Sequence, residues 1–126
     1  MKIIPTHLHG AFDYVCGFML ILSPHLLGIS EAHSPERLVP QLTGFFILVQ
    51  SLMTRYECGV LRVLPMQAHL LSESLAGLFL AISPWVFSFH QASATRWMPH
   101  CVAGGALLIA GLLTAESRRS ILRPAL

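Results

Sequence analysis

Residues 9–24 read HGAFDYVCGFMLILSP, and residues 69–84 read HLLSESLAGLFLAISP. A histidine, a carboxylate, a glycine and a Ser-Pro pair recur at the same spacing in both stretches, sixty positions apart and without a gap. The register continues downstream, where three residues are matched by three identical ones: Gly44, Leu52 and Thr54 by Gly104, Leu112 and Thr114. The chain therefore contains one unit twice, and the two long apolar runs in each copy predict a duplicated helical hairpin.

The composition predicts that lipid surrounds these hairpins. Of the 126 residues, 54% are hydrophobic and only 11% are charged, whereas a soluble domain carries about 25% charged residues. We expect one membrane domain over residues 1–126, with the first repeat at 6–59 and the second at 66–119. The net charge of +2 and the lack of a basic run with interleaved aromatic residues exclude nucleic acid as a partner.

Four stretches without a charged residue mark the expected membrane spans: 14–30, 38–54, 74–95 and 97–115. A helix needs about 20 residues to cross roughly 30 Å of hydrocarbon. This length predicts helices at 6–28, 38–56, 66–87 and 97–116. The expected fold class is all-α, a four-transmembrane-helix bundle built from two tandem, parallel helical-hairpin repeats.

The basic residues predict the orientation of this bundle. Six of them fall on the side of the two termini and the middle loop: Lys2, Arg55, Arg62, Arg118, Arg119 and Arg123. Only Arg37 and Arg96 fall on the other side, so the positive-inside rule places both termini in the cytoplasm. Because each unit has two spans, the second copy enters the membrane in the same direction as the first. The repeats are therefore parallel, which lowers the expectation of an alternating-access transporter, since many of those use inverted repeats.

Two further features bear on helix geometry and packing. Pro24 and Pro84 each remove a backbone donor, so the first and third helices should bend or end within a turn. Trp85 follows the second proline and suits the membrane interface, and His25 takes its place in the first copy. Small residues that let helices approach closely in lipid are Gly17, Gly44, Gly77, Gly104, Ala106 and Ala110.

The stretches LILSPHLLGIS and LAISPWVFSFH, each followed by a second apolar helix with a central glycine, resemble the SPW-repeat family of small bacterial membrane proteins. The second copy carries Ser83, Pro84 and Trp85 intact, and the first reads Ser23, Pro24 and His25, so it departs from the motif at the tryptophan. The resemblance covers nearly the whole chain and implies a multi-pass protein of the bacterial inner membrane. It implies no catalytic residue.

The most informative polar residues are two pairs, His9 with Asp13 and His69 with Glu73. Each pair is four residues apart, so its members share one face of a helix. An aspartate at the centre of a bilayer costs roughly 2.5–3.5 kcal/mol and normally finds a partner or water. The parallel repeat brings both faces to one depth, so we expect a candidate intramembrane cluster of two imidazoles and two carboxyl groups.

Three interpretations of this cluster stay open at this level. It can be structural, with each carboxyl bound to a histidine to fix the register of the two halves. It can hold a transition metal, since imidazole and carboxylate suit zinc, iron and manganese, or a haem on His9 and His69. It can also relay protons, although Phe18, Met19 and Leu20 form an apolar barrier farther out.

No Gly-rich phosphate loop, Ser-His-Asp set or nucleophile elbow is present in the sequence. The function expected first is therefore a non-enzymatic membrane component, either an accessory subunit or a self-associating protein, with other membrane subunits or copies of itself as partners. No catalytic residue, metal or cofactor is required by that expectation. The alternative is a small metal-binding, haem-binding or proton-conducting protein centred on His9, Asp13, His69 and Glu73.

Overall fold

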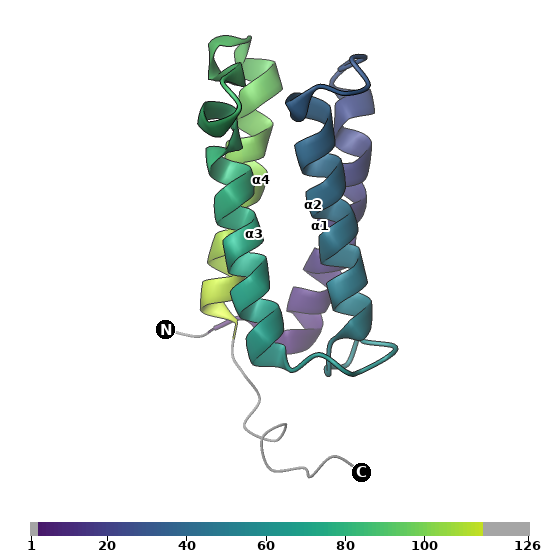
Figure 1. Cartoon of the computed structure of the whole chain (residues 1–126). Helices are drawn as coiled ribbons and strands as arrows, with labels where there is room; N and C mark the ends of the chain where they lie inside the picture. Colours follow the sequence, from purple (N-terminus) through teal and green to yellow (C-terminus); the bar gives the residue numbers. More distant parts are fainter. Residues whose placement is uncertain (1–2, 115–126) are drawn as a thin grey trace.

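The computed structural model describes residues 3–114, and within this range four helices pack as two hairpins. Helix α1 (Thr6–Leu26) pairs with α2 (Pro35–Met53), and α3 (Met66–Val86) pairs with α4 (Ala94–Leu113). A short 3-10 helix, η1 (Phe89–Gln91), lies in the turn of the second hairpin. The two hairpins stand side by side along one direction (Figure 1). The described residues form no strand, so the predicted all-α, four-helix class is confirmed.

Helices α2 and α4 are displaced from their predicted limits, each beginning and ending three residues earlier. They begin early because Ser34 and Ser93 have extended backbones (ψ 143° and 148°) and act as the N-cap residues, so the helices start at the next residue. In α2 that residue is Pro35, and proline favours the first helical position. They end early because Thr54 and Thr114 are extended as well. The predictions had instead taken charged residues as the limits. The predicted helix end at residue 116 and the basic residues Lys2, Arg118, Arg119 and Arg123 lie outside the described residues.

The Ser-Pro pairs end α1 and α3 as predicted, two residues beyond each proline. Pro24 cannot donate to the carbonyl of Leu20, four residues earlier, and the Ser23 hydroxyl donates to that carbonyl instead (2.9 Å). In the second copy the Ser83 hydroxyl donates to the Leu80 carbonyl in the same way (2.7 Å). The serine thus satisfies the acceptor that the proline leaves free, which explains why the two residues recur together.

The third position of the motif has a partner on the second helix of its own hairpin. The rings of Trp85 and Trp97 meet edge to face, with centroids 5.9 Å apart. The residues at the same positions of the first repeat also meet, with Arg37 Nη2 3.5 Å from His25 Nε2. The first copy therefore differs from the second at both positions of this contact: the aromatic pair Trp85 and Trp97 is replaced by the polar pair His25 and Arg37.

Glycines bring the two helices of each hairpin into backbone contact. A Cβ atom built on Gly17 would lie 3.1 Å from the Gly44 carbonyl oxygen, and one on Gly77 would lie 2.7 Å from the Gly104 carbonyl oxygen. Both are closer than ordinary van der Waals contact. Each hairpin is therefore packed as a tight pair whose helix spacing depends on these glycines.

The two hairpins exchange their leading segments at the end of the bundle where the α2–α3 loop lies, which we call the junction end. The Ile3 and Ile4 amides donate to the Leu113 carbonyl at the end of α4 (2.8 and 3.1 Å). The Leu64 amide makes the equivalent bond to the Met53 carbonyl at the end of α2 (2.7 Å). Each repeat is thus anchored on the other. The opposite end, which we call the hairpin end, holds the turn within each hairpin, and there Arg96 of α4 also pairs with Glu36 of α2 (3.0 Å).

The α2–α3 loop is also fixed to α1. The hydroxyl of Thr6 lies 2.9 and 2.8 Å from the two carboxylate oxygens of Glu57. The backbone amide of Glu57 itself and this hydroxyl lower the pKa of the carboxyl, because both hydrogen-bond its charged form.

Two helices are long and apolar enough to cross a membrane by length and composition. They are α3 and α4, each with a mean hydropathy of 1.2 over its most apolar window. Helices α1 and α2 do not reach this threshold among the described residues.

Candidate functional site: a buried histidine and carboxylate cluster

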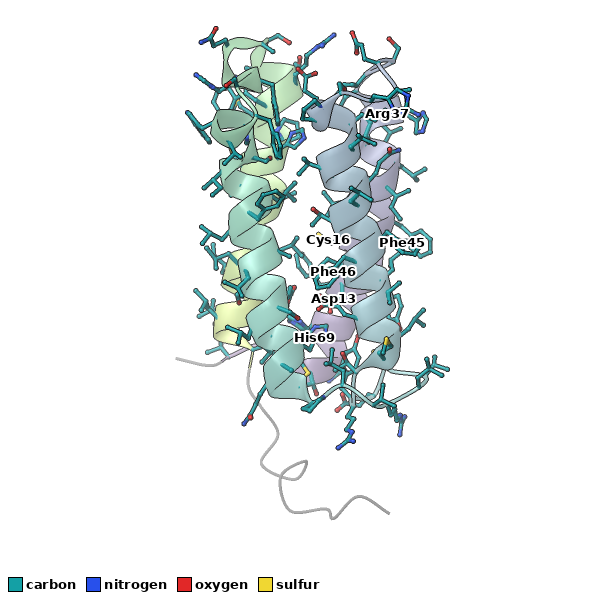
Figure 2. The ribbon with its side chains drawn as sticks, in the orientation of Figure 1. Asp13, Cys16, Arg37, Phe45, Phe46 and His69 are labelled. Atoms are coloured by element: carbon teal, nitrogen blue, oxygen red, sulfur yellow. The ribbon has the colours of Figure 1, made fainter. Side chains whose placement is uncertain are left out.

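The structure brings His9, Asp13, His69 and Glu73 together between the two hairpins. The exposed fraction is 1% for His9 and 0% for the other three. One ligand atom from each residue lies within 4.8 Å of all the others. Figure 2 shows Asp13 and His69 between the hairpins, toward the junction end.

The shortest polar contacts cross from one repeat to the other. His9 Nε2 lies 2.9 Å from Glu73 Oε2, and His69 Nε2 lies 3.0 Å from Asp13 Oδ2. The contacts within each repeat are longer, 3.4 Å for His9 with Asp13 and 3.8 Å for His69 with Glu73. The two Nε2 atoms are themselves 3.2 Å apart. Neither repeat can therefore form the cluster alone.

Two threonines fix the orientation of the imidazole rings, again across the repeats. Thr114 Oγ1 lies 2.7 Å from His9 Nδ1, and Thr54 Oγ1 lies 2.8 Å from His69 Nδ1. Each threonine hydroxyl already donates to the carbonyl four residues earlier in its helix, at 2.6 Å. It must then accept from the ring nitrogen, so Nδ1 carries the hydrogen in both histidines.

This arrangement leaves four electron-pair donors facing one another. With Nδ1 protonated, a neutral histidine presents a bare Nε2 to its neighbours, and a carboxylate offers only acceptors. Four such atoms in a dry interior repel one another unless hydrogen or a cation lies among them. Protons on the histidines or on the carboxyl groups can fill this role by bridging Nε2 and carboxyl oxygen, and a metal ion can fill it by binding all four atoms.

The cluster departs from two-fold symmetry at its carboxyl groups. The Ser51 hydroxyl donates to Asp13 Oδ2 (3.0 Å), but the matching position in the second repeat is Gly111, which has no side chain to donate to Glu73. Glu73 Oε1 and Asp13 Oδ1 are buried without a hydrogen bond, and Glu73 Oε2 has only its ion-pair contact with His9 Nε2. The Gln50 amide nitrogen and the Tyr56 hydroxyl are also buried without one. The Tyr56 ring centroid lies 5.9 Å from that of His69, and Gln50 directly precedes Ser51.

Five of the six buried polar side-chain atoms that lack a hydrogen bond in residues 3–114 thus belong to the cluster or its neighbours. Buried polar groups in proteins are nearly always satisfied, and an orphan group often marks a missing ion or water molecule. The described atoms that lack a hydrogen bond are therefore concentrated at this one place.

The other histidines of the described chain do not join the cluster. His100 is buried near the hairpin end and donates from Nε2 to the Glu36 carbonyl (3.1 Å). His90 stacks on Trp85, and His25 contacts Arg37. Of the two small α4 residues singled out in the sequence, Ala110 lies beside the site, because its carbonyl accepts the hydroxyl of Thr114. Ala106 is half-buried one turn earlier in the helix.

Sequence reasoning missed Ser51, Thr54 and Thr114 as parts of the site. The two threonines carried a signal, because they occupy matching positions in the duplicated pattern. A threonine at the end of a span in both copies, with no packing motif to explain it, indicates a polar role. Helical periodicity alone does not show that this role is to contact the histidines. Ser51 carried no such signal, since its counterpart is a glycine.

Comparison with known proteins agrees with the sequence resemblance. The family model of the SPW repeat domain matches residues 7–114, which include both Ser-Pro motifs and all four cluster residues. No curated protein and no solved structure matches the chain. The matched range covers more than half of the sequence, and the chain therefore belongs to the SPW repeat family.

Proposed function

We propose that this chain is a four-span protein of the bacterial inner membrane that holds one divalent transition-metal ion between its two repeats. The single observation that carries the metal proposal is the convergence of four buried donor atoms whose two histidines both have Nδ1 committed to a threonine. The membrane proposal is supported by where the polar and apolar side chains lie.

The distribution of side chains in residues 3–114 is the reverse of that in a soluble protein. Large apolar side chains are exposed on all four helices, among them Val15, Phe18, Leu42, Phe45, Leu71, Leu75, Val102 and Leu112. Phe45 points away from the bundle in Figure 2. Histidine, carboxyl, hydroxyl and amide groups are instead buried. This supports four spans, since α1 and α2 owe their lower hydropathy partly to inward-facing polar residues such as Asp13 and Gln50.

Membrane orientation has a direct test in a variant without its native cysteines. A cysteine introduced by Arg62→Cys in the α2–α3 loop is expected to react with an impermeant thiol reagent only from the cytoplasmic face. A cysteine introduced by His33→Cys in the α1–α2 turn is expected to react only from the opposite face. Labelling of both from one face would contradict four spans with cytoplasmic termini.

The donor geometry is close to that of a tetrahedral metal site. Metal–ligand bonds of about 2.0–2.1 Å imply donors separated by about 3.3 Å at the corners of a tetrahedron. Five of the six donor separations are 2.9, 3.0, 3.2, 3.4 and 3.8 Å, and all four ligand atoms lie within 4.8 Å of one another. Two imidazoles and two carboxylates suit zinc, iron or manganese in their divalent states.

Charge balance also favours a divalent ion. Two carboxylates and one M²⁺ ion are neutral together, which limits the cost of burying them in a medium where unpaired charge is expensive. Haem fits less well, because the two imidazole rings meet edge to face with centroids only 5.3 Å apart and Nε2 atoms in contact. That contact leaves no space for a macrocycle between the rings.

Thr54 and Thr114 orient the two histidines, because each hydroxyl accepts a hydrogen bond from the Nδ1–H group of one ring. Replacing Thr54 and Thr114 by valine keeps their shape but removes the acceptor for each Nδ1–H. We expect the double variant to bind Zn²⁺ about 10–100-fold more weakly, the usual cost of losing such partners. Isothermal titration or chelator competition measures the affinity. The control is Thr43→Val, because Thr43 donates only to the Val39 carbonyl of its own helix. Equal affinity in all three proteins would contradict the assigned role.

Proton binding is the competing interpretation, and metal analysis separates the two. Protein purified without chelator is expected to contain about one equivalent of metal per chain. A metal-free protein that takes up no Zn²⁺, Co²⁺, Mn²⁺ or Fe²⁺ on titration would show that protons alone balance the cluster.

The chain acts, we propose, as an accessory or self-associating component rather than as an enzyme. The segments joining its helices are short, and the described residues that could hold a metal together are the four of the buried cluster. Exposed apolar faces on all four helices offer surface for neighbours in the bilayer. Cross-linking in native membranes is expected to give discrete higher-mass species, and a strictly monomeric protein would contradict this role.

A further inference from the structure

The cluster is sealed toward the hairpin end by an apolar layer with one residue from each helix. Leu20, Ile47, Leu80 and Leu107 have exposed fractions of 5%, 0%, 0% and 0% and belong to one buried cluster. Leu20 and Leu80 lie seven residues beyond Asp13 and Glu73, which is about 10 Å along a helix. An ion with its hydration shell does not cross such a layer, so the cation must reach the cluster by another side.

The two seams between the hairpins differ in polarity beside the cluster. The seam between α2 and α3 carries Gln50 and Ser72, and the Ser72 hydroxyl lies 2.6 Å from Gln50 Oε1. Their counterparts in the seam between α1 and α4 are Ala110 and Phe12, which have no polar side-chain atom. At these matched positions, the repeats therefore place polar side chains in the α2–α3 seam and apolar ones in the α1–α4 seam.

Ser72 and Gln50 connect the edge of the bundle to the cluster. Ser72 is half-buried, whereas Gln50 is 5% exposed. The Ser72 hydroxyl also bonds the His69 carbonyl (3.0 Å), and the Gln50 carbonyl accepts the hydroxyl of Thr54 that orients His69. Gln50 thus contacts a partly accessible hydroxyl through its side chain and the threonine that orients His69 through its backbone, and its Nε2 atom is buried without a hydrogen bond.

A glutamine amide suits this position because it has a donor end and an acceptor end. The Ser72 hydroxyl can donate to the amide oxygen or accept from the amide nitrogen. When the amide rotates, its free end changes from N–H groups that bind water to a carbonyl oxygen that binds a cation. Such a group can replace part of the hydration shell while an ion passes.

We propose that Gln50 and Ser72 form the port through which the cation reaches the cluster, at the junction-end half of the α2–α3 seam. This inference rests on the metal site proposed above and identifies the route by which the ion reaches it. The port faces the cytoplasmic side in the proposed orientation, so the protein exchanges its ion with one side of the membrane and does not conduct ions across it.

The test is the rate of Co²⁺ uptake by the full chain in detergent after its metal has been stripped by a chelator, followed by visible absorption. Gln50→Leu is expected to slow uptake at least tenfold and to leave the final content at one Co²⁺ per chain. Gln41→Leu is the matched control, because Gln41 lies on the same helix near the hairpin end, where its amide donates to the Ile21 carbonyl. Its uptake rate should equal that of the unmodified chain.

A second arm leaves Gln50 unchanged. In a chain without native cysteines, Ser72→Cys is modified with a cationic methanethiosulfonate reagent, and the symmetry-related Phe12→Cys is modified in parallel. Modification at position 72 is expected to slow Co²⁺ uptake, and modification at position 12 is not. Equal effects at both positions, or an unchanged rate in Gln50→Leu, would overturn the port. Failure of the unmodified chain to bind Co²⁺ would instead overturn the metal site itself.

Discussion

Replacing His9 and His69 together by alanine is expected to reduce bound zinc from about one ion per chain to less than about a tenth. Both donor nitrogens disappear, and the two carboxylates that remain cannot hold the ion in a closed four-ligand site. The loss should exceed that in the threonine variants, because those change only the orientation of the ligands. Elemental analysis of protein purified in one batch with the unmodified chain measures the difference.

The matched control is His25→Ala with His90→Ala, which also removes two imidazoles but leaves the cluster intact. It should retain the full zinc content. Because two unpaired buried carboxylates are destabilising by several kcal/mol, the experiment includes His9→Gln with His69→Gln, which keeps a polar group at each position. If either cluster variant binds as much zinc as the unmodified chain, the metal lies elsewhere.

Gly104→Ala is expected to destabilise the second hairpin by about 1–3 kcal/mol, the usual cost of overpacking a tight interface. A Cβ atom at this position would lie 2.5 Å from the Gly77 carbonyl oxygen and 2.8 Å from the Ala81 Cα atom. Both obstacles belong to the backbone of α3, so the helices must separate to admit the methyl group. The gain in helix propensity from glycine to alanine, about 1 kcal/mol, only partly offsets this cost.

The neighbouring residue supplies the control for this prediction. A Cβ atom on Gly105 meets nothing within 4 Å. Gly105→Ala should therefore leave stability unchanged or raise it by up to about 1 kcal/mol through helix propensity alone. Thermal unfolding in a mild detergent compares the two variants directly. Similar melting temperatures for both would show that α3 and α4 are not packed through Gly104.

The duplicated pattern predicted much of this architecture. Four helices, their pairing as hairpins and the shared face of His9 with Asp13 follow from residue spacing, because helical periodicity is a local property of the chain. The helix ends after Pro24 and Pro84 were also predictable, since the effect of proline on the preceding turn is local. The structure added the reason for the serine, whose hydroxyl satisfies the carbonyl that the proline cannot bond.

The crossing of the repeats was not predictable from spacing. Thr114 orients His9 from 105 residues away, and Thr54 orients the histidine of the other copy. These contacts depend on how the leading segment of each repeat pairs with the end of the other hairpin, and helical periodicity carries no information about that exchange. The limits of α2 and α4 were misplaced for a related reason, because Thr54 and Thr114 leave their helices to take part in it.

The duplication within one chain explains how two similar repeats can build an asymmetric site. Ser51 and Gln50 stand on one side of the cluster, whereas the matching positions hold Gly111 and Ala110. A symmetric dimer of single hairpins cannot differ in this way between its halves. Duplication within one chain allows the two carboxyl groups to have different neighbours, one held by a hydroxyl and the other without a hydrogen-bond donor.

X-ray absorption at the zinc edge of the zinc-loaded protein tests the central claim most directly, because it reports the ligands of the ion. The account predicts a four-coordinate ion with two imidazole nitrogens and two carboxylate oxygens at about 2.0–2.2 Å, and a spectrum that changes in Asp13→Asn. A sulfur ligand at about 2.3 Å, which would implicate the cysteines, or a six-coordinate ion unaffected by Asp13→Asn would contradict it.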